Sequence, residues 1–400
     1  MDQIVAAKVA QASELLRGFS IPLWIVQFAR ESYDHPQPVQ ELAVGCSVTW
    51  PAAFIVTDDG HSVAIVGTGD VANVESVGAY RDVVGYVRDV GPPLREALER
   101  FKPDRIGISY SLNDDGADNI SHGMYLTLEG LLRDTPYASR LVSADQVLIA
   151  LRARKQAVEV DRIRASIDTT QELFHAIERE LRPGVAEYQI FDMVHEMVES
   201  RGMGMAWDRK YDPVVNFGPN SSFGHAGPTG ITLEPGMLVH VDLGVKQNGY
   251  CSDLQRVWYL LRANEDEAPA EVQAPFDAVV RSMQAGFDVL RPGVAGWQVD
   301  AAARTVLTDA GYEEPAFALG HQLGQSTHDG GALLGPRWPR YGNRPEMPVE
   351  EGHVYTLEYA LRSSAGIIGV EEDVLVTSDG AEYLCPPQTQ LLYVRLPRGS

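Results

Sequence analysis

Cysteine is scarce in this sequence, and the few cysteines that it has are far apart. Three of the 400 residues are cysteine, namely Cys46, Cys251 and Cys385. Small secreted domains that lack a large core rely on several closely spaced cysteine pairs. The spacing seen here therefore excludes a disulfide framework and favours a reducing compartment, the cytoplasm.

Long apolar stretches and an excess of positive charge are also missing. No segment reaches the about 18 uninterrupted apolar residues that a membrane-spanning helix needs. The chain carries 33 lysines and arginines against 55 aspartates and glutamates, a formal net charge of -22. Nucleic acids and anionic membrane surfaces attract basic proteins, so we expect neither as a partner. The amphipathic N-terminal segment does not have the pattern of a signal peptide.

The first 150 residues alternate apolar strands with helical stretches but contain no phosphate-binding loop. Gly67-Thr-Gly69 follows a predicted strand, yet it lacks the third glycine and the helix of a dinucleotide-binding fingerprint. We expect an α/β domain with a mixed sheet over residues 1–150. The predicted strands cover 21–27, 52–57, 62–66 and 105–109, and the helices lie near 91–100 and 125–133.

The remaining residues show a different pattern, in which pairs of helices precede strands. A charged amphipathic helix is expected to begin at Leu151 and to end before Pro183. A second helix follows at 187–201, and another pair is expected at 275–290 and 297–310, each pair being followed by strands. Because 400 residues exceed the usual size of a single core, we predict a second domain over 151–395, an α+β domain with a pseudo-symmetric repeat.

Two aspartates lie eleven residues apart in the segment VHVDLGVKQNGYCSDLQRVW (239–258). Its centre, Asn248-Gly249, is a strong signal for a two-residue hairpin loop. That loop pairs Asp242 with Gln255 and puts Asp242 and Asp253 on one face as diagonal neighbours. Such diagonals are about 7–8 Å apart at the backbone, so both carboxylates can converge on two cations about 3.5–4 Å apart.

A second hairpin is predicted near the C-terminus, where two strand-like segments are joined by Ser-Ser-Ala-Gly. The length of its loop is an assumption. A hairpin centred on Ala365 places Glu358 opposite Glu372 and leaves Glu371 on the other face. This register predicts Glu372, and not Glu371, as the acid that joins the two aspartates.

Four separated segments together resemble the metal-site segments of the M24 metallopeptidases in order and spacing. They are DLGVKQNGYCSDLQR, GHQLGQSTHD, TLEYA and EEDVLVT. These enzymes have the pita-bread fold and include methionine aminopeptidase, aminopeptidase P, prolidase and creatinase. The resemblance covers about residues 151 to 390, and the first 150 residues look like the creatinase/prolidase N-terminal domain.

The resemblance implies a site for two divalent metal ions. It makes Asp242 a ligand of one ion, Asp253 a bridging ligand, and His321, Glu358 and Glu372 the remaining ligands, with Glu372 also bridging. Oxygen-rich coordination with one imidazole suits manganese, cobalt, iron or zinc, and the sequence does not choose among them.

The resemblance also implies a mechanism. A water held between the two cations attacks the scissile carbonyl as hydroxide, and Glu358 passes its proton to the leaving nitrogen. His225, at the end of the segment that begins at Asn216, matches a histidine that lies over the substrate. His328 matches the histidine that contacts the substrate carbonyl.

Several positions depart from the family pattern. Family peptidases usually have Glu-Pro-Gly-x-Tyr where this chain has Glu358-Tyr-Ala-Leu-Arg362, and an arginine where it has Val370, two residues before Glu372. A threonine is replaced by Gln255, and Asp329 replaces a glutamate after His328. Arg362, at the place of the missing tyrosine, is our candidate for a substrate-binding positive charge.

The sequence thus favours hydrolysis of Xaa-Pro peptide bonds by an Xaa-Pro dipeptidase. The alternatives are an Xaa-Pro aminopeptidase, a metal-dependent lyase or hydrolase of small zwitterions, and a non-catalytic peptide-binding module on the same fold. The resemblance also implies a homodimer. Bound metal and the release of proline separate these alternatives.

Overall fold

The computed structural model describes residues 3–222, 224 and 226–395, and it forms two compact units, Met1–Arg152 and Ala153–Ser400. No helix within these described ranges is long and apolar enough to cross a membrane. His225, one of the predicted substrate contacts, lies outside the described residues.

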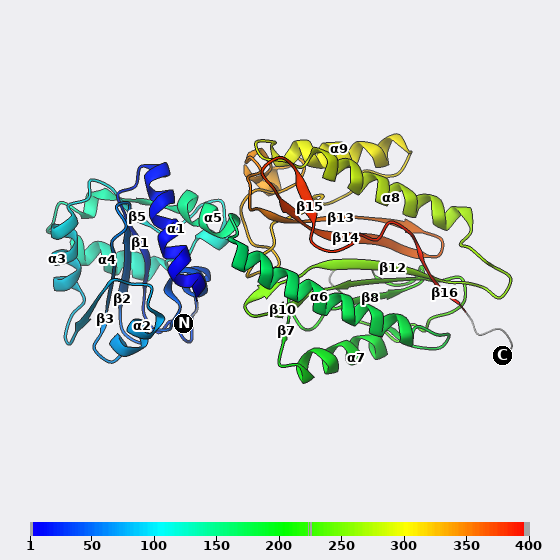
Figure 1. Cartoon of the computed structure of the whole chain (residues 1–400), viewed down its shortest axis with the longest axis horizontal. Helices are drawn as coiled ribbons and strands as arrows, with labels where there is room; N and C mark the ends of the chain where they lie inside the picture. Colours follow the sequence, from blue (N-terminus) through cyan, green and yellow to red (C-terminus); the bar gives the residue numbers. More distant parts are fainter. Residues whose placement is uncertain (1–2, 223, 225, 396–400) are drawn as a thin grey trace. The chain divides into compact units, whose positions relative to one another are not determined.

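A six-stranded mixed sheet forms the centre of the first unit (Figure 1). Its strand order is β4-β3-β2-β1-β5-β6, and the strands are β1 (Leu23–Ala29), β2 (Ala52–Thr57), β3 (Ser62–Gly67), β4 (Asp82–Tyr86), β5 (Ile106–Ile108) and β6 (Leu141–Ser143). Strands β1, β2 and β3 are antiparallel in sequence, whereas β4, β5 and β6 join parallel to their neighbours. The predicted mixed sheet is confirmed.

Helices cover both faces of this sheet because alternate strand residues are apolar on both sides. The five helices are α1 (Gln3–Phe19), α2 (Val71–Val77), α3 (Gly91–Phe101), α4 (His122–Leu132) and α5 (Asp145–Ala153). Trp24 and Val26 of β1 pack with α1 and α5, while Leu23 and Ile25 pack with α3 and α4. The unit therefore has two apolar layers, one on each side of the sheet.

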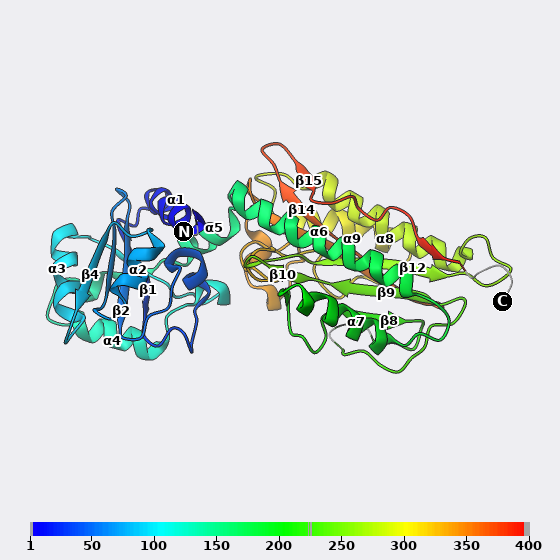
Figure 2. The ribbon, with the colours of Figure 1, turned by 60° about the horizontal axis from the view of Figure 1, so that its bottom comes forward.

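The second unit has two pairs of helices, each followed by strands (Figures 1 and 2). The first pair, α6 (Ala157–Glu180) and α7 (Glu187–Ser200), precedes β7 (Gly204–Met205), β8 (Val214–Phe217), β9 (Leu238–Leu243), β10 (Val245–Gln247), β11 (Tyr250–Cys251) and β12 (Leu254–Leu260). The second pair, α8 (Ala270–Val289) and α9 (Gly296–Asp309), precedes β13 (Val354–Ser363), β14 (Gly366–Val376), β15 (Ala381–Tyr383) and β16 (Leu392–Val394). This is the predicted pseudo-repeated layout.

One helix boundary differs from the prediction. The expected helix from Leu151 is broken, since α5 ends at Ala153 and α6 begins at Ala157. The backbone N–H of Gln156 donates to Glu159 Oε2 at 2.8 Å, which satisfies a donor that the new helix start leaves without an intrahelical partner. The charged run there reads as one helix in sequence because the break contains neither glycine nor proline.

A seven-stranded sheet carries the acidic segments of the second unit. Its main path is β13-β14-β12-β9-β8, with β15 added to β14 and β16 to β12. One face of β13 and β14 packs against α8 and α9 through a large apolar core, and α8 and α9 lie side by side in Figure 1. The opposite face of this sheet holds the polar residues described next.

Candidate metal centre

The hairpin that carries the two aspartates has the predicted register. Asn248 and Gly249 both have positive φ, 52° and 81°, as a tight two-residue hairpin turn requires. Lys246 pairs with Cys251, and Asp242 with Gln255, so the pairing continues from the turn into the large sheet. The predicted pairing of Asp242 with Gln255 is confirmed.

Four polar residues form one row across neighbouring strands. Asp242 pairs with Gln255, Gln255 pairs with Glu371, and Glu371 pairs with Glu358. Directly paired residues point to the same face of a sheet. Asp253 precedes Gln255 by two residues and shares that face as well. The sheet thus gathers four carboxylates around one amide.

The predicted register of the second hairpin was wrong by one residue. Ser363 pairs with Gly366, so the loop has two residues, and Glu358 lies opposite Glu371 instead of Glu372. A slip of one residue turns every side chain of a strand to the other face. Glu371 therefore joins the acidic row, and Glu372 does not.

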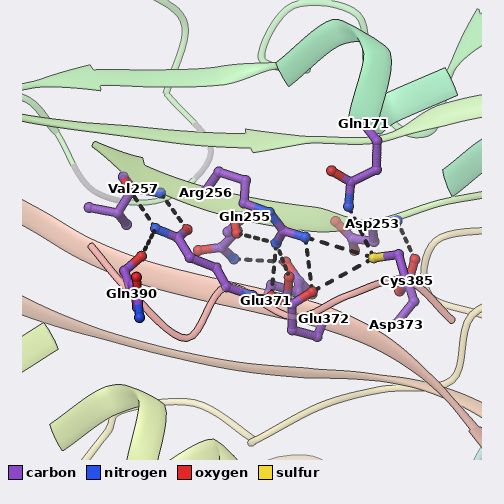
Figure 3. A network of polar contacts seen from close by, with 11 residues as sticks. Gln171, Asp253, Gln255, Arg256, Val257, Glu371, Glu372, Asp373, Cys385 and Gln390 are labelled. Atoms are coloured by element: carbon purple, nitrogen blue, oxygen red, sulfur yellow. Dashed lines mark hydrogen bonds and ion pairs between the residues drawn. The ribbon is translucent and has the colours of Figure 1, made fainter. Parts of the chain in front are cut away.

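Glu372 lies on the other face of β14 in a buried ion pair with Arg256 (Figure 3). Arg256 Nη1 and Nη2 donate to the two carboxylate oxygens of Glu372, each at 3.0 Å, and the backbone N–H of Gln388 donates to Oε1 at 2.6 Å. Its oxygens are thus occupied by protein donors. The prediction of Glu372 as a metal ligand is corrected: Glu371, and not Glu372, lies in the acidic row.

A cavity opens over the acidic row. It is lined by Trp207, Tyr211, Asp242, Asp253, His321, Thr327, His328, Glu358 and Glu371. Arg362 is exposed near the turn of the second hairpin and is not among the described residues that line this cavity. Its predicted contact with substrate is therefore not supported, because it lies four residues along β13 from Glu358.

His321 faces the acids with one nitrogen and is oriented through the other. Its Nε2 lies 3.6 Å from Asp253 Oδ2 and 3.9 Å from Glu358 Oε1. Its Nδ1 lies 3.3 Å from the carbonyl oxygen of Gln322, so a proton on Nδ1 has an acceptor. Burial, with His328 adding to it, lowers the pKa of His321 to about 3. The ring is neutral at pH 7, and its Nε2 lone pair is directed at the acids.

His328 lies beside His321. The two ring centroids are 4.3 Å apart and the rings are nearly perpendicular. The next residue, Asp329, accepts a hydrogen bond from the buried Lys155 Nζ at 2.8 Å, and its backbone N–H donates to the Gln322 carbonyl at 2.8 Å. These contacts hold the loop that presents His328 to the cavity.

Burial together with mutual repulsion makes the acids reluctant to ionise. Burial raises the pKa of Asp242 to about 7, and burial and the nearby Asp242 raise the pKa of Glu358 to about 8. The pKa values of Asp253 and Glu371 are raised well above their ordinary range, first by burial and then by repulsion from the neighbouring acids. A cation among these acids would remove the repulsion and let them ionise at neutral pH.

The chemistry of these donors fits a divalent cation. One atom each of Asp253, His321 and Glu371 lies within 4.8 Å of the others. Asp242 Oδ1, Glu371 Oε1 and Asp373 Oδ1 are buried and accept no hydrogen bond from any described residue. Since a buried carboxylate oxygen without a partner is costly, a cation in the cavity that Asp242 and Glu371 line would stabilise these two side chains.

Two further buried acids were not predicted from the sequence. Asp373 lies two residues after Glu371 on the same face, and its Oδ2 accepts from the backbone N–H of Asp253 at 3.2 Å. Asp212 accepts hydrogen bonds from the backbone N–H groups of Ala206 at 2.9 Å and Trp207 at 3.3 Å. The alternation along β14 would have indicated Asp373 once the register was known, whereas no spacing signal points to Asp212.

Comparisons with known proteins agree with this geometry. The sequence profile described as metallopeptidase family M24 matches residues 161–378, more than half of the chain. A putative dipeptidase, YkvY of Bacillus subtilis, is 27% identical over 315 residues, 78% of this chain and 80% of that protein. An Xaa-Pro dipeptidase of Lactobacillus delbrueckii subsp. lactis is 26% identical over 302 residues, which cover 75% and 76% of the two chains.

A solved structure is similar over the whole chain. Dipeptidase PepE of Mycobacterium ulcerans has a TM-score of 0.74 and 23% sequence identity, and the match covers 99% of this chain and 100% of that one. At this identity the likeness speaks for the fold alone. The expected architecture, an α/β N-terminal domain followed by a pita-bread domain, is confirmed.

Proposed function

The chain belongs to metallopeptidase family M24 and is a peptidase, and from this premise we propose that it is an Xaa-Pro dipeptidase with a two-cation centre. Relatives named Xaa-Pro dipeptidase support the proposed substrate class. The observation that carries the proposal is the row of Asp242, Glu371 and Glu358 across three strands, with Asp253 and His321 beside it.

Five residues would hold the cations, namely Asp242, Asp253, His321, Glu358 and Glu371. When bound, two divalent cations lower the pKa of a water molecule toward neutrality and polarise the peptide carbonyl. Manganese, cobalt, iron and zinc all suit this donor set.

Glu358 is proposed to move the proton. Its Oε1 is the oxygen that lies 3.9 Å from His321 Nε2, and the side chain lines the cavity, where a carboxylate can accept a proton from water and pass it to the leaving nitrogen. His328, on the cavity wall beside His321, is proposed to donate to the substrate carbonyl oxygen. Trp207 and Tyr211 line the same cavity and would exclude water from the peptide.

The proposal is tested by the products that the purified protein releases. With added manganese, we expect release of proline from Xaa-Pro dipeptides, little release of alanine from Xaa-Ala dipeptides as a matched control, and slow cleavage of longer Xaa-Pro peptides. Faster cleavage of the longer peptides would identify an Xaa-Pro aminopeptidase instead. Absence of free proline from the dipeptides, together with absence of the free N-terminal residue from the longer peptides, would contradict both activities.

Metal analysis and one variant test the centre itself. We expect about two divalent ions per chain after dialysis against manganese. Glu358→Gln retains the shape of the side chain but cannot accept the proton, so proline release should fall by about 10²- to 10⁴-fold. The homodimeric state and the cytoplasmic location stay predictions, which sedimentation and cell fractionation would check.

A further inference from the structure

An amide occupies the middle of the acidic row. The NH₂ group of Gln255 donates to Glu371 Oε2 at 2.8 Å and to Glu358 Oε2 at 3.2 Å (Figure 3 shows the contact with Glu371). The amide thus donates one hydrogen bond to the Oε2 atom of each glutamate. Of the other two oxygens, Glu358 Oε1 lies 3.9 Å from His321 Nε2, and Glu371 Oε1 is buried with no hydrogen-bond partner among the described residues.

The oxygen of this amide faces a second set of buried polar groups. Gln255 Oε1 lies 2.8 Å from His240 Nε2, and His240 Nδ1 lies 3.0 Å from Asn216 Oδ1. Asn216 Nδ2 in turn donates to the carbonyl oxygen of Ser222 at 2.8 Å. Gln255, His240 and Asn216 are all buried. Turning the amide over would place its oxygen against two carboxylates, whereas a proton on His240 Nε2 has an acceptor in Gln255 Oε1, so the orientation with the NH₂ group toward the glutamates is favoured.

A glycine makes room for this arrangement. With Glu371 in the acidic row, the position two residues earlier is Gly369, not Val370. A Cβ atom on Gly369 would come within 2.5 Å of Gln255 Oε1 and 2.6 Å of His240 Nε2. Both of these atoms are at the ends of polar side chains. Because glycine has no Cβ atom, Gln255 and His240 can occupy the space beside position 369.

We propose that Gln255 is a positioning residue of the metal centre, which binds Oε2 of Glu358 and of Glu371 and leaves their Oε1 atoms for the cations. Each glutamate then offers a single, fixed oxygen instead of two exchangeable ones. Preorganised ligands bind a cation more tightly because less order has to be gained on binding. The inference rests on the proposed two-cation function, and it assigns a role to a residue that is not itself a ligand.

The first experiment removes the donors and retains the volume. Gln255→Met replaces the amide by an apolar group of similar size. We expect the affinity of the metal-free protein for Mn²⁺, measured by calorimetry, to fall by about 10- to 100-fold, as is typical for outer-sphere partners of metal ligands. The visible absorption spectrum of bound Co²⁺ should also change, because the glutamates are free to rotate. Gln171→Met is the matched control, since that amide contacts Cys385 on the other face of the sheet (Figure 3).

The second experiment displaces the amide without deleting it. Gly369→Ala should push the end of Gln255 aside and weaken Mn²⁺ binding, by less than Gln255→Met does. If the alanine acts through the amide, adding it to Gln255→Met should weaken binding no further. Thermal unfolding of each metal-free variant shows whether a change in affinity comes from loss of the fold.

The outcomes separate this inference from the proposed function. A wild-type protein that binds no divalent cation would overturn both. If the wild type binds Mn²⁺ and folded Gln255→Met binds it equally well with the same Co²⁺ spectrum, the positioning role of Gln255 is refuted and the proposed function stands. Equal and additive losses from Gly369→Ala and Gln255→Met would also refute it.

Discussion

Two hairpins carry the acids of the candidate metal centre, and they differ in how their turns are built. The hairpin of β9 to β12 turns at Asn248 and Gly249, which both have positive φ. The hairpin of β13 and β14 turns at Ser364 and Ala365, neither of which has positive φ. A two-residue turn with positive φ at both positions matches the twist of the paired strands. Few residue types other than glycine and asparagine adopt it readily. In the second hairpin the positive φ, 137°, falls on Gly366, which closes the turn, and not on either loop residue.

This difference decides which side chains enter the site. Because an Asn-Gly turn allows one loop length, it fixes the register of Asp242 against Gln255. Ser-Ser-Ala-Gly allows several loop lengths, and a change of one residue exchanges Glu371 for Glu372. The two glutamates are neighbours in sequence, yet one faces a cavity with other acids and one is paired with Arg256.

The largest effect is expected on the affinity for Mn²⁺, when the two neighbouring glutamates are substituted one at a time. Glu371→Gln should weaken binding of Mn²⁺ by more than about 100-fold, since loss of a ligand exceeds the 10- to 100-fold of an outer partner. Glu372→Gln should leave the affinity near that of the wild type. Calorimetry on both metal-free variants checks this. The opposite ranking would mean that the register of β13 and β14 differs from the one described.

The ion pair on the other face should matter for stability. Arg256→Met leaves Glu372 buried without its partner, and breaking a buried pair costs about 3–5 kcal/mol. Arg164→Met is the control, because its pair with Glu382 is exposed and is worth about 0–1 kcal/mol. Urea unfolding at pH 7 measures both. Similar losses from the two substitutions would contradict the buried character of the Arg256 pair.

The acids of the cavity should make the metal-free protein sensitive to pH. In the unfolded chain Asp242 and Glu358 lose their protons near their ordinary pKa values of 3.8 and 4.5, whereas in the fold they retain them to about 7 and 8. The folded state binds more protons in this window, so stability is complete below it and is lost as pH rises through it. The melting temperature in EDTA should therefore fall between pH 5 and pH 8 by roughly 5 °C or more.

Bound cations should remove this sensitivity. With saturating Mn²⁺ the acids are ionised as ligands, and the bound cation stabilises the fold more at the higher pH. Melting curves recorded with Mn²⁺ at the same pH values test this. A metal-free protein whose stability rises from pH 5 to pH 8 would contradict the raised pKa values of Asp242 and Glu358.

The smallest effect is expected at the turns. Gly249→Ala forces an alanine into a left-handed conformation, at a cost of about 1–2 kcal/mol. Ser364→Ala in the other turn should change stability by less than about 0.5 kcal/mol, because Ser364 itself does not have positive φ. Denaturant unfolding of the two variants compares the turns directly. Equal costs would show that the turns do not differ in the way described.

Sequence patterns predicted much of the fold because the signals are local. The apolar strands and amphipathic helices of both units lie close to the predicted ranges, and the boundary error at Leu151 arose where a helix break has no glycine or proline. Asp242, Asp253, His321, Glu358 and His328 lie together on or beside one cavity, as the motif spacing predicted. Glu372 and Arg362 do not.

The residues that the sequence did not assign depend on contacts between distant segments. To identify Glu371 as the acid that faces the cavity, the loop length of its hairpin must be known. To find Gln255 between the acids, the pairing of β9, β12 and β14 must be known. Asp212 reaches the site region from a loop before β8, with no periodic pattern to indicate its direction.

The sequence by itself determined the family, since its separated acidic and histidine motifs resemble those of the M24 metallopeptidases and the family profile matches residues 161–378. Only the tertiary structure decided which of two adjacent glutamates serves it, and that an amide stands between the acids. The physical reason is the two-residue period of a strand. Its phase is set by pairing with neighbouring strands and not by the sequence of the strand itself.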